Sequence, residues 1–338
     1  MGLSAAVYGC QGTELTPEEV RFFREARPFG FILFSRNCVA RTQLRALCGS
    51  LREAADNRNA PIFIDQEGGR VARLAPPQWR ARPPARRLGE LFEHNSDKGR
   101  HAAYLCARLI AHDLTTVGIT ANCAPVLDVP SAGAHDVIGD RAYSREPGVV
   151  IELGRATIEG YLDGGVLPVI KHIPGHGRAT ADSHLELPRV TASIDELSLL
   201  DFVAFRGLHN APIAMTAHVV YEAIDPKRPA TTSSRVVNKI IRGEIGFEGL
   251  LVSDDLSMGA LSGPLGARAK VALLAGCDIV LHCNGKLVEM REVAAHVKPL
   301  AGEAAVRAAT ALAQLRPPVP LDIALAEARL GEIIGADA

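Results

Sequence analysis

Short runs of apolar residues recur along the chain, and each ends in polar residues or glycine. Runs of this length are typical of strands that are buried on both faces of a sheet. We therefore expect eight buried strands, at 3–8, 31–34, 61–65, 120–128, 168–172, 213–218, 250–254 and 278–282.

The segments between these runs show the periodicity of amphipathic helices. Two of them have clear starts, at Thr16 and Ser193, because a capping side chain is followed by acidic residues in the first turn. Since strands alternate with helices, the sheet should be parallel. The expected helices are 17–26, 42–56, 99–117, 149–163, 195–208, 234–244 and 267–275, followed by a helical tail at about 303–334.

This order of elements predicts an α/β fold, a (β/α)8 barrel of the TIM type. An open, doubly wound sheet is the alternative, but the chain has neither of its usual glycine-rich motifs, G-x-G-x-x-G and G-x-x-x-x-G-K-[ST]. We expect a single domain, with the barrel over about 3–300 and extra C-terminal helices over about 301–338. The proline- and arginine-rich stretch at 76–87 should be an exposed loop.

Composition narrows the class of ligand. Hydrophobic residues make up 47% of the chain, enough for a core without disulfides, and the formal net charge of -1 gives no basic footprint for nucleic acid or an anionic membrane. The seven cysteines lack metal-binding spacing and are expected to be reduced thiols. The start of the chain predicts neither a signal peptide nor an anchor. We therefore expect a cytoplasmic monomer that binds a small molecule.

Ionisable residues end five of the eight predicted strands. In a barrel, chemistry collects at the carboxyl ends of the strands, whereas charges buried in a core are costly unless paired. The pattern therefore predicts a functional mouth. Asp128 could equally form a structural ion pair, whereas a role in ligand chemistry is favoured for Asp254. The strand-ending residues are Asp65, Asp128, Lys171 with His172, His218 and Asp254.

The segment after the fifth predicted strand is rich in chemically active side chains. Its glycines and proline favour close approach of the backbone to a ligand. Asp182 and His184 are two positions apart, so the carboxylate could accept the imidazole N–H, fix its tautomer and raise its basicity. This pair predicts a positioned general acid/base. His176 could instead brace the loop through a hydrogen bond.

Two other classes of protein remain open. A metal-dependent hydrolase could use ligands at the mouth, but barrels of the amidohydrolase type carry an H-x-H pair after the first strand, where this chain has Tyr8-Gly9. A non-catalytic sugar-binding barrel would not need the pair of Asp182 and His184. In a metal-dependent hydrolase, the candidate metal ligands would be His172, His176, His184, His218 and Asp254.

Three segments carry a resemblance to a known family. They are DQEGGRVAR at 65–73, KHIPGHG at 171–177 with DSH at 182–184, and SDDLSM at 253–258. Together they resemble the family 3 glycoside hydrolases, in particular the single-domain bacterial β-N-acetylglucosaminidases of peptidoglycan recycling. The resemblance spans about 3–284 and implies a retaining enzyme that releases terminal N-acetylglucosamine from muropeptide fragments and needs no metal or cofactor.

The resemblance also implies roles for individual residues. Asp254 matches the nucleophile, and Asp182 and His184 match the acid/base dyad. The residues that match the subsite for the terminal sugar are Asp65, Arg73, Arg141, Lys171 and His172. Supporting roles are expected for His176, His218, Asp255 and Asp128.

The chain departs from the family pattern at two points. Ile173 stands where phenylalanine is usual, and Gly259 follows Met258 where glutamate is common. Both bear on loop packing and on the preference for the leaving group. The chain also shows no pattern for the C-terminal β-sandwich of larger family 3 glucosidases, which favours the small N-acetylglucosaminidase branch.

Overall fold

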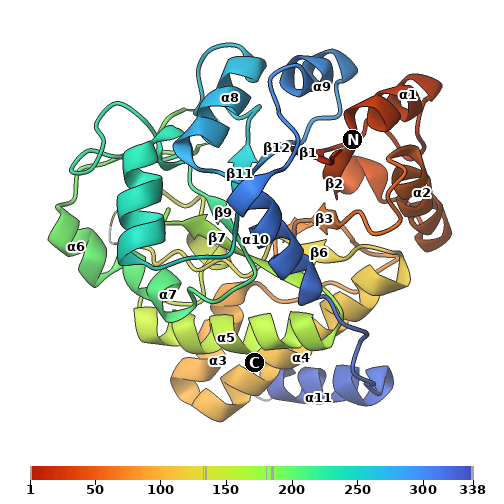
Figure 1. Ribbon diagram of the computed structural model, residues 1–338. Helices are drawn as coiled ribbons and strands as arrows, with labels where there is room; N and C mark the ends of the chain where they lie inside the picture. Colours follow the sequence, from red (N-terminus) through yellow and green to blue (C-terminus); the bar gives the residue numbers. More distant parts are fainter. Residues whose placement is uncertain (1, 132, 134, 180, 184–185, 336–338) are drawn as a thin grey trace.

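The computed structural model describes residues 2–335 except 132, 134, 180, 184 and 185. Within these residues, parallel strands close into a barrel in the order β1-β12-β11-β9-β7-β6-β3-β2 (Figure 1). The predicted barrel is therefore confirmed, and each apolar run overlaps one of its strands. These are β1 (Ser4–Tyr8), β2 (Pro28–Leu33), β3 (Ile62–Ile64), β6 (Ala121–Asn122), β7 (Leu167–Ile173), β9 (Ile213–Thr216), β11 (Leu250–Asp255) and β12 (Ile279–His282).

The helices surround the barrel. Both predicted starts are confirmed as capping boxes, in which Thr16 pairs with Glu19 and Ser193 pairs with Glu196. The predicted helix at 195–208 is two helices, and the one at 234–244 is a π-helix. The helices are α1 (Pro17–Ala26), α2 (Arg41–Ala54), α3 (Ala85–His94), α4 (Ser96–Thr116), α5 (Pro147–Asp163), α6 (Ile194–Leu199), α7 (Asp201–Gly207), η4 (Val236–Glu244), α8 (Leu265–Ala275) and α9 (Leu287–Ala294).

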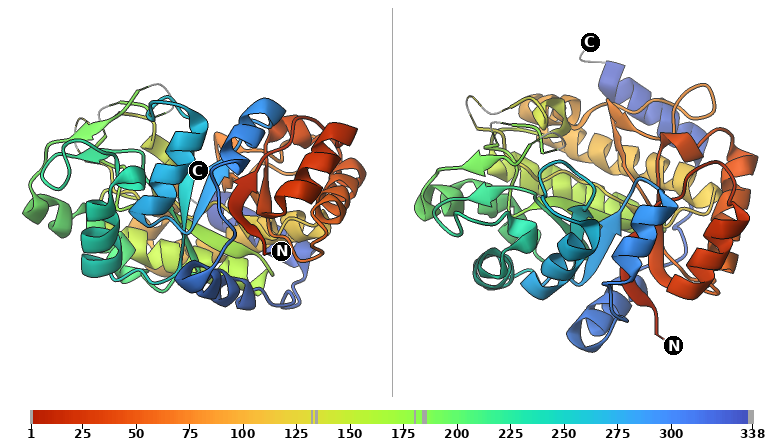
Figure 2. Two further views of the ribbon diagram at one scale, coloured as in Figure 1. Left: turned by 45° about the horizontal axis from the view of Figure 1, so that its top comes forward. Right: turned by 90° about the horizontal axis from the view of Figure 1, so that it is seen from above.

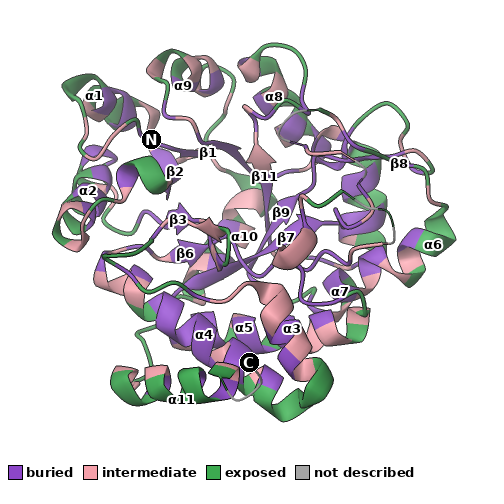
Figure 3. Ribbon diagram, turned by 180° about the vertical axis from the view of Figure 1, so that it is seen from behind, coloured by how far each residue is buried: buried purple, intermediate pink, exposed green. Residues whose placement is uncertain are grey.

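Alternation along the strands divides the core into two layers. Val7 points into the barrel, whereas its neighbours Ala6 and Tyr8 pack in the layer between barrel and helices. Figure 3 shows the strands as buried and most of the exposed surface on the helices. Both faces of the sheet are thus covered, which explains why the strands appear in the sequence as continuous apolar runs.

One C-terminal helix closes the barrel at the amino ends of its strands. Ala308 and Ala311 of α10 (Gly302–Ala313) belong to the cluster that fills the barrel interior. In the right-hand view of Figure 2, α10 lies at one end of the molecule and the loops after β6 and β7 lie at the other. The open end is therefore the carboxyl end of the strands.

The last helix, α11 (Ile323–Gly335), packs against α4 and covers part of the proline- and arginine-rich stretch (Figure 1). The expectation that this stretch is exposed is wrong for Trp79 and Arg82, which are buried. Arg82 Nη2 lies 2.7 Å from Glu327 Oε1 of α11 and 3.6 Å from Asp113 Oδ2. Tertiary packing of the distant helix supplies the cover that local composition does not reveal. Among the described residues, no helix has both the length and the apolar character needed to cross a bilayer.

The ion pair between Arg82 and α11 gives a stability prediction. Glu327→Ala should lower the free energy of unfolding by about 2 kcal/mol, because a buried guanidinium loses its main partner while Asp113 remains. Arg80→Ala is the matched control, since Arg80 contacts the same carboxylate at 3.4 Å but is largely exposed, and it should cost less than about 0.5 kcal/mol. Urea unfolding measures both, and equal losses would contradict the assignment.

Candidate active site

Two ladder irregularities mark the open end of the barrel. Along β7, Lys171 pairs with Met215 and Ile173 pairs with Thr216, so one extra residue is inserted at His172. Along β11, the pairing with β12 also slips by one residue between Val252 and Asp255. Such bulges re-aim side chains and are frequent beside active sites. They fall on segments that the sequence marks as functional.

Lys171 lies at the centre of a cluster of charged side chains. Its Nζ is 2.8 Å from Asp65 Oδ1 and 2.6 Å from Glu67 Oε1. Arg73 Nη2 donates to Asp65 Oδ2 at 3.1 Å. Arg141 donates from Nε and Nη2 to the two oxygens of Glu67, at 2.9 and 2.8 Å. The structure thus brings together four of the predicted sugar-binding residues and adds Glu67 to them.

The cluster is ionised at neutral pH. Burial raises the pKa of Asp65 and of Glu67, but the neighbouring cations, Lys171 foremost, hold both pKa values below their ordinary range. Burial lowers the pKa of Lys171, whereas Asp65 and Glu67 raise it above its ordinary value. The side chains therefore offer charge-assisted hydrogen bonds, which suit sugar hydroxyls.

The DQEGG segment forms a short hairpin of β4 (Gln66–Gly68) and β5 (Val71–Ala72). The side-chain oxygen of Gln66 accepts the N–H groups of Arg73 and Leu74 and so holds the hairpin closed. Gly68 has a φ of +103°, and a Cβ there would lie 2.4 Å from the Pro83 oxygen. Glycine is therefore required for the turn that presents Asp65 and Glu67.

Asp128 holds the histidines that follow Lys171. Its Oδ2 lies 2.7 Å from His172 Nδ1, and its Oδ1 accepts the backbone N–H of His176 at 2.6 Å. Because Nδ1–H donates to the carboxylate, the Nε2 of a neutral His172 is left as an acceptor. Asp128 has no exposed surface, so it forms the structural pair that the sequence left open and does not itself reach a ligand.

His176 braces the loop after β7. Its Nε2 is 3.1 Å from the hydroxyl of Ser183, and the backbone carbonyl of Ser183 accepts the N–H of Ala260 from the loop after β11. Burial and the neighbouring His172 lower the pKa of His176 to about 4, so its ring is neutral at pH 7. This matches the bracing alternative for His176.

The predicted dyad is only partly described. Asp182 is half-buried beside Ser183, and its backbone oxygen accepts the N–H of Glu186. His184 lies outside the described residues. The contact between Asp182 and His184 therefore stays a prediction.

Asp254 is the second-last residue of β11, lies at the bulge and faces the charged cluster. Burial raises its pKa, but His218, His172 and Lys171 lower it below the ordinary value, so the carboxylate is ionised. Its Oδ1 accepts the N–H of Asp255 at 2.8 Å, and within the described part of the chain Oδ2 accepts no hydrogen bond. Asp254 thus has an ionised oxygen free to react.

Asp255 and His218 support this position. Asp255 Oδ1 accepts the N–H groups of Ser257 and Cys283 at 3.0 and 3.1 Å, and its Oδ2 accepts the Ser257 hydroxyl. His218 Nε2 donates to the Asp255 carbonyl at 3.0 Å, while its Nδ1 lies 2.7 Å from the Thr231 hydroxyl. The two adjacent aspartates therefore differ, because the carboxylate of Asp255 is fully engaged in holding the backbone.

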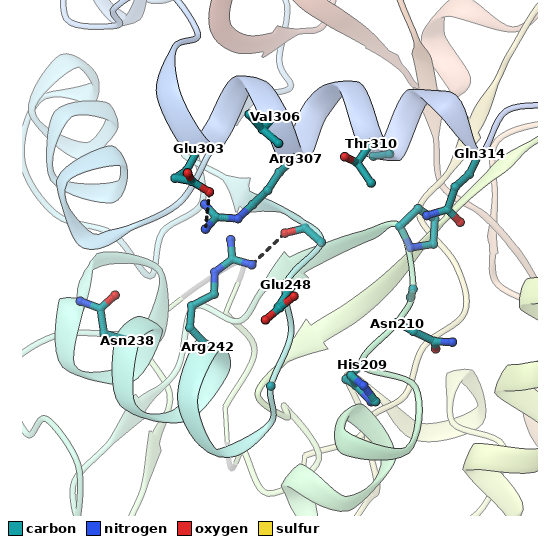
Figure 4. A pocket seen from close by; sticks show the side chains of 15 residues that line it. His209, Asn210, Asn238, Arg242, Glu248, Glu303, Val306, Arg307, Thr310 and Gln314 are labelled. Atoms are coloured by element: carbon teal, nitrogen blue, oxygen red, sulfur yellow. Dashed lines mark hydrogen bonds and ion pairs between the residues drawn. The ribbon is translucent and has the colours of Figure 1, made fainter.

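The described residues include no group of three or more His, Cys, Asp or Glu side chains arranged to hold a metal ion. A hollow of about 940 Å³ lies at the opposite end of the barrel, against α10 (Figure 4). Its two partly exposed cations, Arg242 and Arg307, both pair with Asp278, at 2.8 and 3.0 Å. Volume alone therefore does not mark the site, since these charges already satisfy one another.

Comparison with known proteins identifies the family. Residues 18–313 match the family described as "Glycosyl hydrolase family 3 N terminal domain". The chain belongs to glycoside hydrolase family 3. This family 3 enzyme is 42% identical over 290 residues to a protein named beta-hexosaminidase from Alkalilimnicola ehrlichii, which covers 84% of the chain and 82% of that relative.

Solved structures agree in fold. NagZ from Neisseria gonorrhoeae has a TM-score of 0.87 and 30% identity, over 100% of this chain and 99% of that one. A family 3 beta-N-acetylglucosaminidase from Paenibacillus sp. has a TM-score of 0.82 and 31% identity, over 99% of this chain and 62% of that one. The family 3 enzyme is therefore a glycoside hydrolase, similar to proteins named for action on N-acetylhexosamines.

Sequence reasoning missed two parts of the site in the family 3 enzyme. Glu67 is two residues from Asp65 in the same motif, so its charge next to a strand end was an available signal. Thr231 comes from a 3-10 turn far along the chain, and nothing in its local sequence marks it as the partner of His218.

The contrast between the two aspartates can be tested by stability. Asp255→Ala should lower the free energy of unfolding of the family 3 enzyme by about 2–3 kcal/mol, because it removes three hydrogen bonds and leaves a buried N–H unpaired. Asp254→Ala should cost about 1 kcal/mol or less, since it removes one. Chemical denaturation at pH 7 compares them, and the reverse order would assign the structural role to Asp254.

Proposed function

We propose that this family 3 enzyme is a retaining exo-β-N-acetylglucosaminidase. Its substrates would be muropeptide fragments, in which a terminal N-acetylglucosamine is joined β-1,4 to anhydro-N-acetylmuramic acid with or without peptide. The observation that carries the proposal is the ionised Oδ2 of Asp254, which accepts no hydrogen bond from the described residues and faces the charged cluster around Lys171. The likeness to beta-hexosaminidases and to NagZ supports the choice of sugar.

The first chemical step would be attack of Asp254 on the anomeric carbon. The bond between that carbon and the leaving oxygen breaks, and the leaving oxygen takes a proton from the imidazolium of His184. A covalent glycosyl-enzyme results. In the second step, His184 takes a proton from water, the water oxygen attacks the anomeric carbon, and the Asp254 carboxylate leaves with retention of configuration.

Histidine replaces the carboxylic acid of the usual two-carboxylate template. Asp182 would orient the ring and raise its basicity. During the second step the neutral imidazole does not repel the carboxylate that departs, whereas two carboxylates would repel each other. Since the first step needs imidazolium and the second needs imidazole, activity should be highest near neutral pH.

The charged cluster would bind the terminal sugar. Asp65 would accept protons from hydroxyl groups, while Lys171, Arg73 and Arg141 donate to them, and the acceptor nitrogen of His172 completes the set. Lys171 also helps to keep Asp254 ionised, because it lowers the pKa of that carboxyl together with His218 and His172. Holding the sugar in place converts attack by Asp254 into an intramolecular step.

We assign the enzyme to the cytoplasm, as a monomer acting in cell-wall recycling. All seven cysteines are free, six of them buried, as expected in a reducing compartment.

The nucleophile can be tested directly. Asp254→Ala should lower the turnover of an aryl N-acetylglucosaminide by about a thousandfold or more, because no covalent intermediate can form. Treatment of the wild-type enzyme with a 5-fluoro-N-acetylglucosaminyl fluoride should add the mass of the sugar to the peptide that contains Asp254. A label on another residue, or none in active enzyme, would reject this assignment.

The acid/base role predicts a dependence on the leaving group. His184→Ala should slow the release of a sugar leaving group far more than the glycosylation step with a dinitrophenyl glycoside, which departs without a proton. Asp182→Asn should show the same dependence on the leaving group, with smaller losses in rate. Rates of the first step across a series of leaving groups measure it. Uniform losses would mean that the loop only positions the substrate.

A further inference from the structure

Glu67 is a buried carboxylate for which the proposed reaction has no chemical step. Its side chain is 7% exposed, and it contacts two cations, Lys171 and Arg141. Among the described residues, no hydrogen bond or ion pair joins Glu67 to Asp254. Burying a carboxylate is costly unless it is paired, so its partners explain its presence.

We propose that Glu67 is a positioning residue that aims Lys171 and Arg141 at the terminal sugar. This inference rests on the proposed function, because it concerns how that sugar is held.

The N–H donors of Lys171 show how the orientation of its ammonium group is fixed. An ammonium group has three N–H donors. Asp65, which follows strand β3, accepts one of them at 2.8 Å. Glu67, which lies in the hairpin, accepts another at 2.6 Å. Two fixed acceptors determine the direction of the third donor. That donor is the one left for a hydroxyl group of the sugar.

Arg141 is fixed in the same way. Glu67 accepts from Nε and Nη2, and the Val137 carbonyl accepts from Nη1 at 3.2 Å. The two-pronged contact holds the guanidinium plane, which a single hydrogen bond would not. Its remaining N–H donors keep a set direction, so the sugar meets a site that is already organised.

Charge gives Glu67 a second effect. The cluster carries one more positive than negative charge, and Asp254 opposite balances it. Lys171 already lowers the pKa of Asp254, and among the described residues the Oδ2 of Asp254 accepts no hydrogen bond, so without Glu67 the ammonium group would turn toward Asp254. An ion pair between them would weaken the nucleophile and remove a donor from the sugar.

A purely structural role makes a different prediction. Glu67 also ties the hairpin to the 3-10 turn η2 (Gly139–Arg141), and loss of this tether could simply reduce the folded fraction. A second ion pair joins the same two segments outside the cluster, because Arg70 Nε lies 2.8 Å from Asp140 Oδ1 with both side chains more than 40% exposed. Asp140→Asn is therefore a matched control for the tether.

The test compares Glu67→Gln and Asp140→Asn with the wild type, using an aryl N-acetylglucosaminide. Glu67→Gln should raise KM about tenfold or more and also lower kcat, while Asp140→Asn should change each less than about twofold. A lower folded fraction would reduce kcat and leave KM unchanged. An unchanged KM in Glu67→Gln, or equal effects of the two variants, would overturn the proposal.

Glu67→Asp keeps the charge and covers the case in which Glu67→Gln does not fold. Its carboxylate is one methylene too short to reach both cations, so KM should still rise several-fold, and an unchanged KM would overturn the proposal. Calorimetric binding of N-acetylglucosamine to each variant separates this question from the reaction itself. A wild type that binds N-acetylglucosamine but does not hydrolyse the aryl N-acetylglucosaminide would reject the proposed function, while the ratio of dissociation constants would still decide the role of Glu67.

Discussion

A buried ammonium group governs the arrangement of the open end of this barrel. Lys171 is almost fully enclosed, so it must have counter-ions, and Asp65 and Glu67 supply them. Presenting both carboxylates from one short segment requires the hairpin with its glycine turn against Pro83. The turn is held by the N–H of Gly69, which donates to the carbonyl of Arg82. The need to pair the charge of Lys171 is thus linked, through the loop, to the contact between Arg82 and the C-terminal helix α11.

Reactivity in the site depends on which carboxylate oxygens accept no hydrogen bond from the described residues. Adjacent aspartates at the end of β11 have the same side chain, yet one is held by three donors and the other has a free oxygen. The bulge between Val252 and Asp255 explains the difference, because it pairs Asp255 with the end of β12 and leaves Asp254 at the mouth. Likewise, both carboxylate oxygens of Asp128 are engaged in hydrogen bonds that hold His172 and His176.

The sequence was sufficient for the barrel, because strands covered on both faces leave continuous apolar runs. It was also sufficient for the residues that end those strands, which the structure gathers at one end. It failed for α3 and α9, whose short helical patterns follow proline- or glycine-containing loops, and for Arg82, which is covered by a helix distant in the chain. Glu67 was overlooked because a counter-ion is defined by its neighbours in space, and local patterns do not give those neighbours. The partner of Asp182 at 184 stays a prediction.

Helix α10, which closes the barrel at the amino ends of its strands, has a kinetic consequence for the proposed reaction. With the interior filled by side chains and α10 beneath it, a sugar bound beside Lys171 in the proposed reaction cannot leave through the barrel and must leave by the open end. The leaving group would lie between the sugar and solvent, so it would depart first. Product release would therefore be ordered, and free N-acetylglucosamine would compete with substrate for the empty enzyme. Under the proposed function, a chain would be shortened only from its tip, one residue at each visit.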